Sequence, residues 1–248
     1  MEGLEKIILK KYNELTKVKN REIRKSVKIE TGTVTVTPVA SEKLLGLQIH
    51  ESLKFSEHIR DCSRSLFRKL NPRMNALKKL SNAASFKTRL MVANATVISV
   101  FTYMITVWGG TEEHLLNSAQ VLQNKAERIV TKLGKATNIN TLLLQTNWLS
   151  IRQLIFYHSV LQIWKVKQNK TPQYLSKIFN PEYEFRTRKV AAGNLRVPDS
   201  NTALAQKSFR VRGITIWNSL PTRLKMYTGK LIGFKKELKS WVKSNVDI

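Results

Sequence analysis

The chain has 248 residues, and its 43 Lys and Arg against 17 Asp and Glu give a formal net charge of +26 at pH 7. Because so much uncompensated charge repels itself, we expect a polyanionic partner, with nucleic acid as the first candidate and an anionic membrane surface as the second. The single cysteine, Cys62, excludes a disulfide framework and a cysteine-rich zinc module. The first residues carry acids and lack the apolar core of a signal peptide, so we expect an intracellular protein of the nucleus or cytoplasm, not a secreted one.

Residues 1–54 predict one helix and a small β element. Residues 1–25 place apolar side chains near helical spacing with lysines between them, which predicts an amphipathic helix. The stretch 27–39 is rich in Val, Ile and Thr and contains Gly32, which predicts a β-hairpin. Residues 43–50 predict a third strand, and three short strands need a larger unit to pack against.

Helices are expected to dominate the remainder. The first begins at Ser56 and is disturbed at Pro72. The second runs from about Ser85 to Trp108 and stops at the following glycine pair. Its uncharged stretch, residues 90–111, is long enough to span a bilayer, but the Asn, Ser and Thr residues within it favour a buried core helix over a membrane span.

A third long helix is expected between a Thr111 cap and Gly134. Cap residues and apolar stripes predict further helices at 139–145, 150–168, 172–179 and 231–244. Residues 180–201 contain prolines and a glycine and are expected to be irregular. The predicted fold is therefore mainly α, with a small antiparallel β-hairpin or three-strand element near the N-terminus.

The acidic residues do not suggest catalysis. Two-metal chemistry requires several converging carboxylates, and the three aspartates, Asp61, Asp199 and Asp247, are far apart in sequence. The adjacent pair Glu112 and Glu113 follows a helix start, where acids complement the helix dipole. His58 and Cys62 are four residues apart, but Cys62 lies on an apolar stripe. We therefore expect no metal site, no cofactor and no active site in this chain.

The basic residues carry the functional signal. Between Asp61 and Glu112 the chain has eight Lys or Arg and no acid. Two further stretches, YEFRTRK (183–189) and SFRVR (208–212), alternate aromatic or aliphatic residues with arginine. If they are extended, each pair of guanidinium groups faces outward together and can follow a phosphate backbone. The alternative interpretation is a partly buried strand with a solvated charged face.

Six blocks follow one another in the order typical of one protein family. They are KLLGLQIHESLKFSEHI (43–59), VFTYMITVWGG (100–110), LQNKAERIVT (122–131), NWLSIRQLIFYHSVLQIWKVKQNKTPQYL (147–175), YEFRTRK (183–189) and SFRVRGITIWNSLP (208–221). Together they resemble the region that follows the palm active site in the reverse transcriptases of non-LTR, LINE-type retrotransposons, particularly jockey-like ones. The resemblance covers about residues 27–245. Leu44 and His50 depart from the family's usual Tyr and Asp, and residues 1–25 match poorly, as in a decayed or truncated copy.

The resemblance implies a truncated, catalytically incompetent portion of an RNA-directed DNA polymerase. The family's aromatic-Ala-Asp-Asp motif and its upstream aspartate hold two Mg²⁺ in the intact enzyme, and neither motif occurs here. The implied parts are an N-terminal helix with the last palm strands, a helical thumb-like region, a helical connection and a basic post-thumb region. Their respective bounds are 1–54, 55–135, 136–180 and 181–248.

The resemblance also implies where nucleic acid binds. Lys43 lies in the block that supports the primer grip, and the helix after it supplies candidate phosphate contacts. The full set of predicted nucleic-acid-binding residues is Lys43, Arg60, Arg64, Arg68, Lys69, Arg73, Lys78, Lys79, Arg186, Arg188, Arg210 and Arg212. The implied partner is RNA or an RNA–DNA duplex, bound through its backbone, with the missing polymerase part as a further possible partner.

Two other hypotheses remain open at this level. One is a helical interaction or scaffold protein whose charge serves a protein or lipid partner. The other is a degenerate element with no selected function, in which apolar surface is exposed where the palm is missing. Charge reversal on the helix after Lys43 separates the first of these from nucleic-acid binding.

Overall fold

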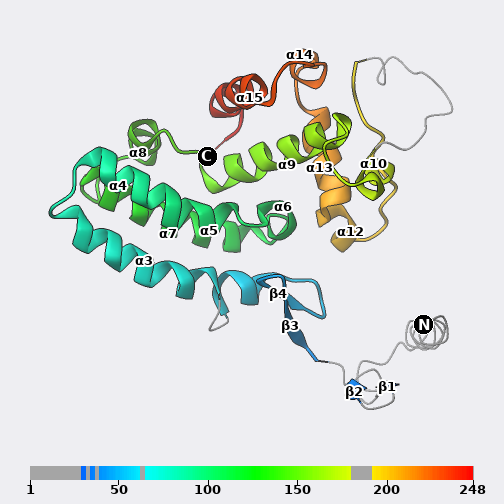
Figure 1. The fold of residues 1–248 in the computed structure, drawn as a ribbon, viewed down its shortest axis with the longest axis horizontal. Helices are drawn as coiled ribbons and strands as arrows, with labels where there is room; N and C mark the ends of the chain where they lie inside the picture. Colours follow the sequence, from blue (N-terminus) through cyan, green and yellow to red (C-terminus); the bar gives the residue numbers. More distant parts are fainter. Residues whose placement is uncertain (1–28, 32–33, 37–38, 62–64, 180–191, 248) are drawn as a thin grey trace. The chain divides into compact units, whose positions relative to one another are not determined.

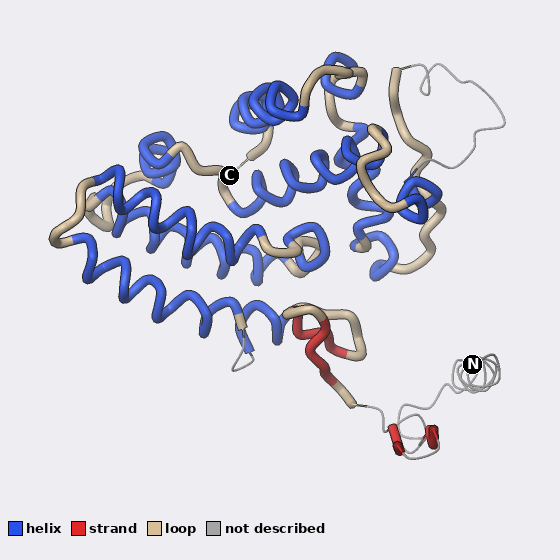
Figure 2. Tube along the Cα trace, in the orientation of Figure 1, coloured by secondary structure: helices blue, strands red, loops and turns tan. Residues whose placement is uncertain are grey.

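A computed structural model describes residues 29–31, 34–36, 39–61, 65–179 and 192–247. The chain divides into two compact units, residues 1–54 and residues 55–248. The second unit holds 32 of the basic and 10 of the acidic residues, so the charge imbalance belongs mainly to it. The fold is mainly helical, with short antiparallel strands in the first unit (Figures 1 and 2).

The described strands of the first unit form two separate hairpins. Strands β1 (Ile29–Thr31) and β2 (Val34–Val36) pair antiparallel, which confirms the hairpin predicted at 27–39. Strands β3 (Ser41–Leu44) and β4 (Leu47–His50) form the second. The helix predicted at 1–25 lies outside the described residues.

The prediction of one strand over 43–50 was wrong, because the chain turns back within it. Leu45 and Gly46 both have positive φ, at 47° and 85°. Two positive φ values in a two-residue loop define the type I′ turn, whose twist matches antiparallel strands. Glycine tolerates this conformation and leucine does so only at a cost, so the Leu-Gly pair was a weak sequence signal for the turn.

The second unit begins with helices that pack side by side. They are η1 (Glu57–Asp61), α3 (Leu66–Ser81), α4 (Phe86–Ala93), η2 (Asn94–Ile98), α5 (Ser99–Thr102), α6 (Ile105–Trp108) and α7 (Glu113–Thr131). Helix α3 packs against both α4 and α7 (Figure 1). Ser65 and Ser85 cap α3 and α4, because their hydroxyls accept hydrogen bonds from Arg68 N and Thr88 N.

The uncharged stretch is a core helix with one buried side and two interruptions. Ala93, Val97, Phe101, Ile105 and Trp108 are at most 1% exposed, which confirms the prediction of core burial. The helix widens to a π-turn in η2 and breaks before α6, where Met104 has φ 48°. No helix in the described part of the chain is long and apolar enough to cross a membrane.

The third predicted helix is α7, but neither of the cap residues expected from the sequence caps it. Glu112, not Thr111, occupies the N-cap of α7, and its side chain makes no capping hydrogen bond. The helix ends at Thr131, and its C-cap, Lys132, takes the left-handed conformation at φ 60°, two residues before Gly134. Its C-terminus therefore closes without the glycine that the sequence pattern favoured.

The remaining helices follow α7 in the chain, and the longest of them is α9. They are α8 (Ile139–Thr146), α9 (Ile151–Lys167), α10 (Gln173–Phe179), α12 (Ala203–Lys207), α13 (Phe209–Asn218), α14 (Thr222–Lys225) and α15 (Leu231–Asn245). Helix α9 contacts α6, α7, α13 and α15 (Figure 1). Trp164 of α9 stacks on Phe234 of α15 at 4.9 Å between ring centroids. The predictions at 139–145, 150–168, 172–179 and 231–244 are confirmed to within one residue at each end.

Residues 209–212 are helical, so the condition under which Arg210 and Arg212 would face outward together is not met. Residues Phe209–Asn218 form helix α13, and the other basic–aromatic stretch, 183–189, lies outside the described residues. In α13, Gly213 and Trp217 are four residues apart and both are buried. Residues four apart lie on the same side of a helix, and this side faces the core. Arg210 and Arg212 are two residues apart, so they point to different sides of α13.

Candidate nucleic-acid interface

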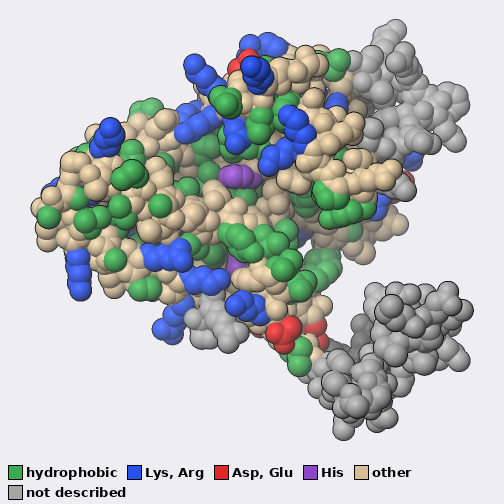
Figure 3. All heavy atoms as spheres, viewed as in Figure 1, with side chains coloured by type: hydrophobic (Ala, Val, Ile, Leu, Met, Phe, Trp, Pro, Cys, Tyr) green, Lys and Arg blue, Asp and Glu red, His purple; other side chains and the backbone are tan. Residues whose placement is uncertain are grey.

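Helix α3 separates apolar from basic residues. Its buried apolar residues repeat every three or four positions and occupy one side. They are Leu66, Leu70, Met74 and Leu77. The other sides carry what we name the α3 basic face: Arg68, Lys69, Arg73, Lys78 and Lys79. Helix α3 contains no acidic residue, and basic side chains accordingly line it in the space-filling view (Figure 3).

Members of the α3 basic face differ in solvent exposure and in the hydrogen bonds that they make within the fold. Arg68, Lys78 and Lys79 are exposed, while Lys69 is half-buried. Arg73 is exposed, but its Nη1 donates to Thr96 O of η2 at 2.8 Å. An arginine has five N–H donors, so Arg73 keeps others for a phosphate.

The turn before α3 adds one exposed base and one buried histidine. Arg60 of η1 is exposed, and Arg64 lies outside the described residues. Burial and the nearby charge of Lys69 lower the pKa of His58 to about 4, so its ring is neutral at pH 7. The predicted Lys43 is exposed on β3 and belongs to the unit of residues 1–54.

The four arginines of the basic–aromatic stretches are not brought together by the described structure. Arg186 and Arg188 lie outside the described residues, and Arg210 is exposed on α13. Arg212 is half-buried, and its Nη2 donates to Thr106 O of α6 at 2.8 Å. Burial lowers the pKa of Arg212 to about 10, which still leaves it charged at pH 7. Arg212 therefore ties α13 to α6 from within the fold.

Several other basic side chains also donate to backbone carbonyl groups. Arg89 is 6% exposed, and it donates from Nε to Val130 O at 2.8 Å and from Nη1 to Ala84 O at 2.6 Å. Lys225 donates to Asn218 O at 2.8 Å. Val130 and Asn218 lie at helix C-termini, where carbonyl groups lack helical partners and attract cations. Some of the basic residues thus stabilise helix C-termini within the fold and do not contribute to a binding surface.

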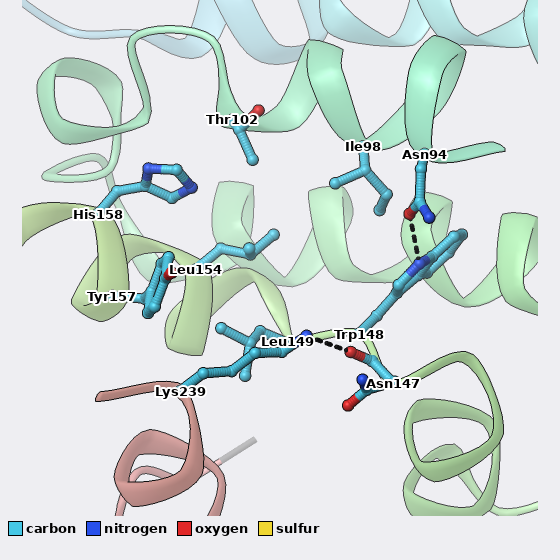
Figure 4. Close-up of a pocket in the computed structure, with 10 residues that line it drawn as sticks. All are labelled: Asn94, Ile98, Thr102, Asn147, Trp148, Leu149, Leu154, Tyr157, His158 and Lys239. Carbon is cyan, nitrogen blue, oxygen red and sulfur yellow. Dashed lines mark hydrogen bonds between the residues drawn. The ribbon is translucent and has the colours of Figure 1, made fainter. Parts of the chain in front are cut away.

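A cavity of about 210 Å³ lies where α5, α9, α15 and the loop before α9 meet (Figure 4). Asn94, Thr102, Asn147, Tyr157, His158 and Lys239 supply its polar lining. Trp148 also lines the cavity, and its Nε1 donates to Asn94 Oδ1 at 2.8 Å. None of the predicted nucleic-acid-binding residues lines this cavity.

Lysines dominate the electrostatics of this cavity. Lys239 Nζ donates to Asn147 O at 2.8 Å, and Lys243 Nζ donates to Asn147 Oδ1 at 2.6 Å. Burial and the charge of Lys243 both lower the pKa of Lys239. The pKa of His158 is lowered to about 4 by burial and by the charges of Lys165 and Lys235. His158 is therefore neutral at pH 7 beside a cluster of cations.

A buried carboxylate lies on α7, close to the same loop. Glu127 is 0% exposed, and its Oε1 accepts a hydrogen bond from Gln123 Nε2 at 3.2 Å. The same Gln123 nitrogen donates to Leu149 O at 2.7 Å. Burial raises the pKa of Glu127 to about 7, against the opposing effects of the Gln123 hydrogen bond and the charge of Arg128. Since Glu127 is enclosed, it influences stability and has no access to a substrate.

The described side chains do not assemble a metal centre, since no group of three His, Cys, Asp or Glu residues comes together among them. The basic surfaces, the cavity and the buried polar groups are thus the chemical features available for function. No protein-family model, curated protein or solved structure matches the chain.

Proposed function

We propose that the protein binds the phosphate backbone of RNA or an RNA–DNA duplex through the α3 basic face, without reading base sequence. The observation that carries this proposal is the segregation within α3, where four apolar residues are buried and the remaining sides carry five basic residues and no acid. Such a surface supplies the charge-based, sequence-independent part of nucleic-acid binding.

The dimensions of the face suit a nucleic-acid backbone. Arg68 and Lys79 are eleven residues apart, so they are separated by about 16 Å along the helix axis. That distance corresponds to about five phosphates of one duplex strand. With about four contacts, the logarithm of the binding constant should fall with the logarithm of salt concentration with a slope of about −4.

The order of the sequence blocks over residues 27–245 supports an origin in a non-LTR retrotransposon reverse transcriptase, in the region after the palm active site. We include in the proposal that this chain does not add nucleotides, because the family's catalytic aspartate motifs do not occur in it. We also propose that the protein acts in the nucleus or cytoplasm, where RNA–DNA duplexes form. Primer extension by the purified chain with Mg²⁺ or Mn²⁺ would contradict this part of the proposal.

The binding test uses fluorescence anisotropy with a labelled RNA–DNA duplex between 50 and 200 mM salt. The variant Arg68→Glu/Lys79→Glu reverses two exposed charges of the face. Its matched control, Lys125→Glu/Lys230→Glu, makes the same change in net charge at exposed positions on α7 and before α15. The α3 variant should lose at least about tenfold in affinity, and its salt slope should be shallower by about 2.

The control variant should keep the wild-type salt slope and most of the affinity. Equal losses in both variants would show that binding follows net charge alone and not α3. Wild-type affinity that is unchanged between 50 and 200 mM salt would overturn backbone binding itself and favour a scaffold role with another partner.

A further inference from the structure

A row of lysines runs along α15 beside the cavity. Lys235, Lys239 and Lys243 are four residues apart, so they lie on one side of the helix with a rise of about 6 Å between neighbours. Lys239 and Lys243 converge on Asn147, and no carboxylate of the described residues forms a salt bridge with either of them. Glu237, the acid of α15, instead pairs with Arg223 at 3.2 Å.

The helices that line the cavity together with α15 add no carboxylate to it. Helices α4, η2, α5 and α9 contain no acidic residue. Lys165 and Lys235 both lie close enough to His158 to lower its pKa. Each lysine ammonium has three donors, so Lys239 and Lys243 retain donors after each bonds to Asn147. This arrangement attracts an anion with several acceptor oxygens.

The cavity next to the row has one aromatic face and fixed polar groups. Tyr157 presents its ring to the cavity (Figure 4). Since Trp148 Nε1 can only donate, it fixes Asn94 Oδ1 toward itself and leaves the amide nitrogen as the donor for a ligand. The volume of about 210 Å³ is below the roughly 300–1,000 Å³ of pockets for drug-sized ligands, so one small ring system suits it.

We propose that this cavity takes one nucleotide of single-stranded nucleic acid, with its base against Tyr157 and its phosphates on Lys239 and Lys243. The inference rests on the proposed function, because it takes nucleic acid as the ligand, but it uses a surface that does not include α3. Aromatic faces and lysines together are the usual means of holding single strands without sequence preference. With both surfaces, the protein has one site for a duplex and a separate site for an unpaired strand.

The test uses the full chain and a labelled six-nucleotide oligouridine, measured by anisotropy. Lys239→Gln removes one phosphate contact, so affinity should fall about fivefold and the salt slope should be shallower by about 0.7. Lys236→Gln is the matched control, because Lys236 is exposed on the same helix outside the row. It should stay within about twofold of wild type.

Two further variants separate contact from folding and base from backbone. Lys235→Gln removes a lysine of the row whose side chain is exposed, so it tests the row without disturbing Asn147. Tyr157→Leu should cost about tenfold for oligouridine and less than about twofold for an abasic oligomer of equal length. Thermal unfolding of each variant verifies that the helices remain folded.

The outcomes distinguish this inference from the proposed function. Equal effects of Lys239→Gln and Lys236→Gln would overturn the inference, and the proposed function would stand if duplex binding still depended on Arg68 and Lys79. Displacement of the hexamer by an equal concentration of uridine monophosphate would overturn assignment to a strand and indicate a free-nucleotide site. If the wild-type chain binds neither duplex nor hexamer at 50 mM salt, both proposals fail.

Discussion

Replacing Glu127 with Gln should change how stability depends on pH. Glu127 is completely buried, and its Oε2 has no hydrogen-bond partner among the described residues. Burial raises its pKa from 4.5 to about 7, so the folded protein holds this proton at pH values where the unfolded chain has released it. The contribution of Glu127 to stability is thus fully present below pH 4.5 and is lost as pH rises through 7.

The size of the effect follows from the difference of the two pKa values. A shift of one pKa unit corresponds to about 1.4 kcal/mol, so the ionisation of Glu127 costs roughly 3 kcal/mol above pH 7. Glutamine has a similar shape, still accepts the hydrogen bond from Gln123 and does not ionise. Glu127→Gln should therefore be more stable than wild type by roughly 3 kcal/mol at pH 8.5 and about equal to it at pH 4.5.

Urea unfolding followed by far-UV circular dichroism measures this difference at pH 4.5, 6, 7 and 8.5. Subtracting wild type from variant at each pH cancels the titration of all other groups. Glu113→Gln is the control, because Glu113 is exposed and forms a surface ion pair with Arg152. A Glu127→Gln difference that stays constant from pH 4.5 to 8.5 would refute the argument that burial controls this carboxyl group.

Two histidines make the stability of the wild-type protein decrease at acidic pH. The pKa values of His58 and His158 are lowered to about 4, so their contribution is fully present above pH 6.5 and is lost as pH falls toward 4. Two groups of this sign outweigh Glu127 between pH 4.5 and 6.5. Wild-type stability should therefore be greatest near pH 6.5.

Two packing predictions complete the set. Arg89→Met removes two hydrogen bonds and leaves the buried Val130 O and the part-buried Ala84 O without them, so unfolding in urea should show a loss of about 3 kcal/mol. The exposed control Lys87→Met should change stability by less than about 0.5 kcal/mol. Gly110→Ala places a Cβ in overlap with the carbonyl oxygen of Lys207 and should cost about 1–3 kcal/mol in the same assay. Gly134→Ala meets no atom within 4 Å and should be close to neutral, and equal effects at the two glycines would contradict the overlap.

Features that depend on neighbouring residues were predictable. Ser150 and Gln153 form a complete capping box at the start of α9, and the α15 stripe of Phe234 and Leu238 is fully buried. Three of the failures have a common cause, because at Leu45, Glu112 and Lys132 the chain turns, begins a helix or ends a helix without the usual residue type. Tertiary packing stabilises such positions, and the residue types of neighbouring positions do not reveal that packing.

The candidate sites were harder to predict, since exposure depends on partners far away in the sequence. Arg68 and Arg212 look alike in sequence, but Arg212 reaches a carbonyl group 106 residues away. The cavity joins Asn94, Asn147 and Lys239, which no sequence window contains. By contrast, the four-residue spacing of Lys235, Lys239 and Lys243 is visible in the sequence and predicts that they share one side of a helix.

The contacts of Arg89 and Lys225 with carbonyl groups have a consequence for handling the protein. Neutral acceptors hold these cations, so salt does not weaken the contacts as it weakens surface ion pairs. The same salt screens the mutual repulsion of the remaining cations and releases nucleic acid from them. High ionic strength should therefore strip co-purifying RNA from the protein while leaving the helices intact. Concentrated salt is therefore a suitable storage condition for this protein, because it reduces the repulsion between its cations and leaves these buried contacts in place.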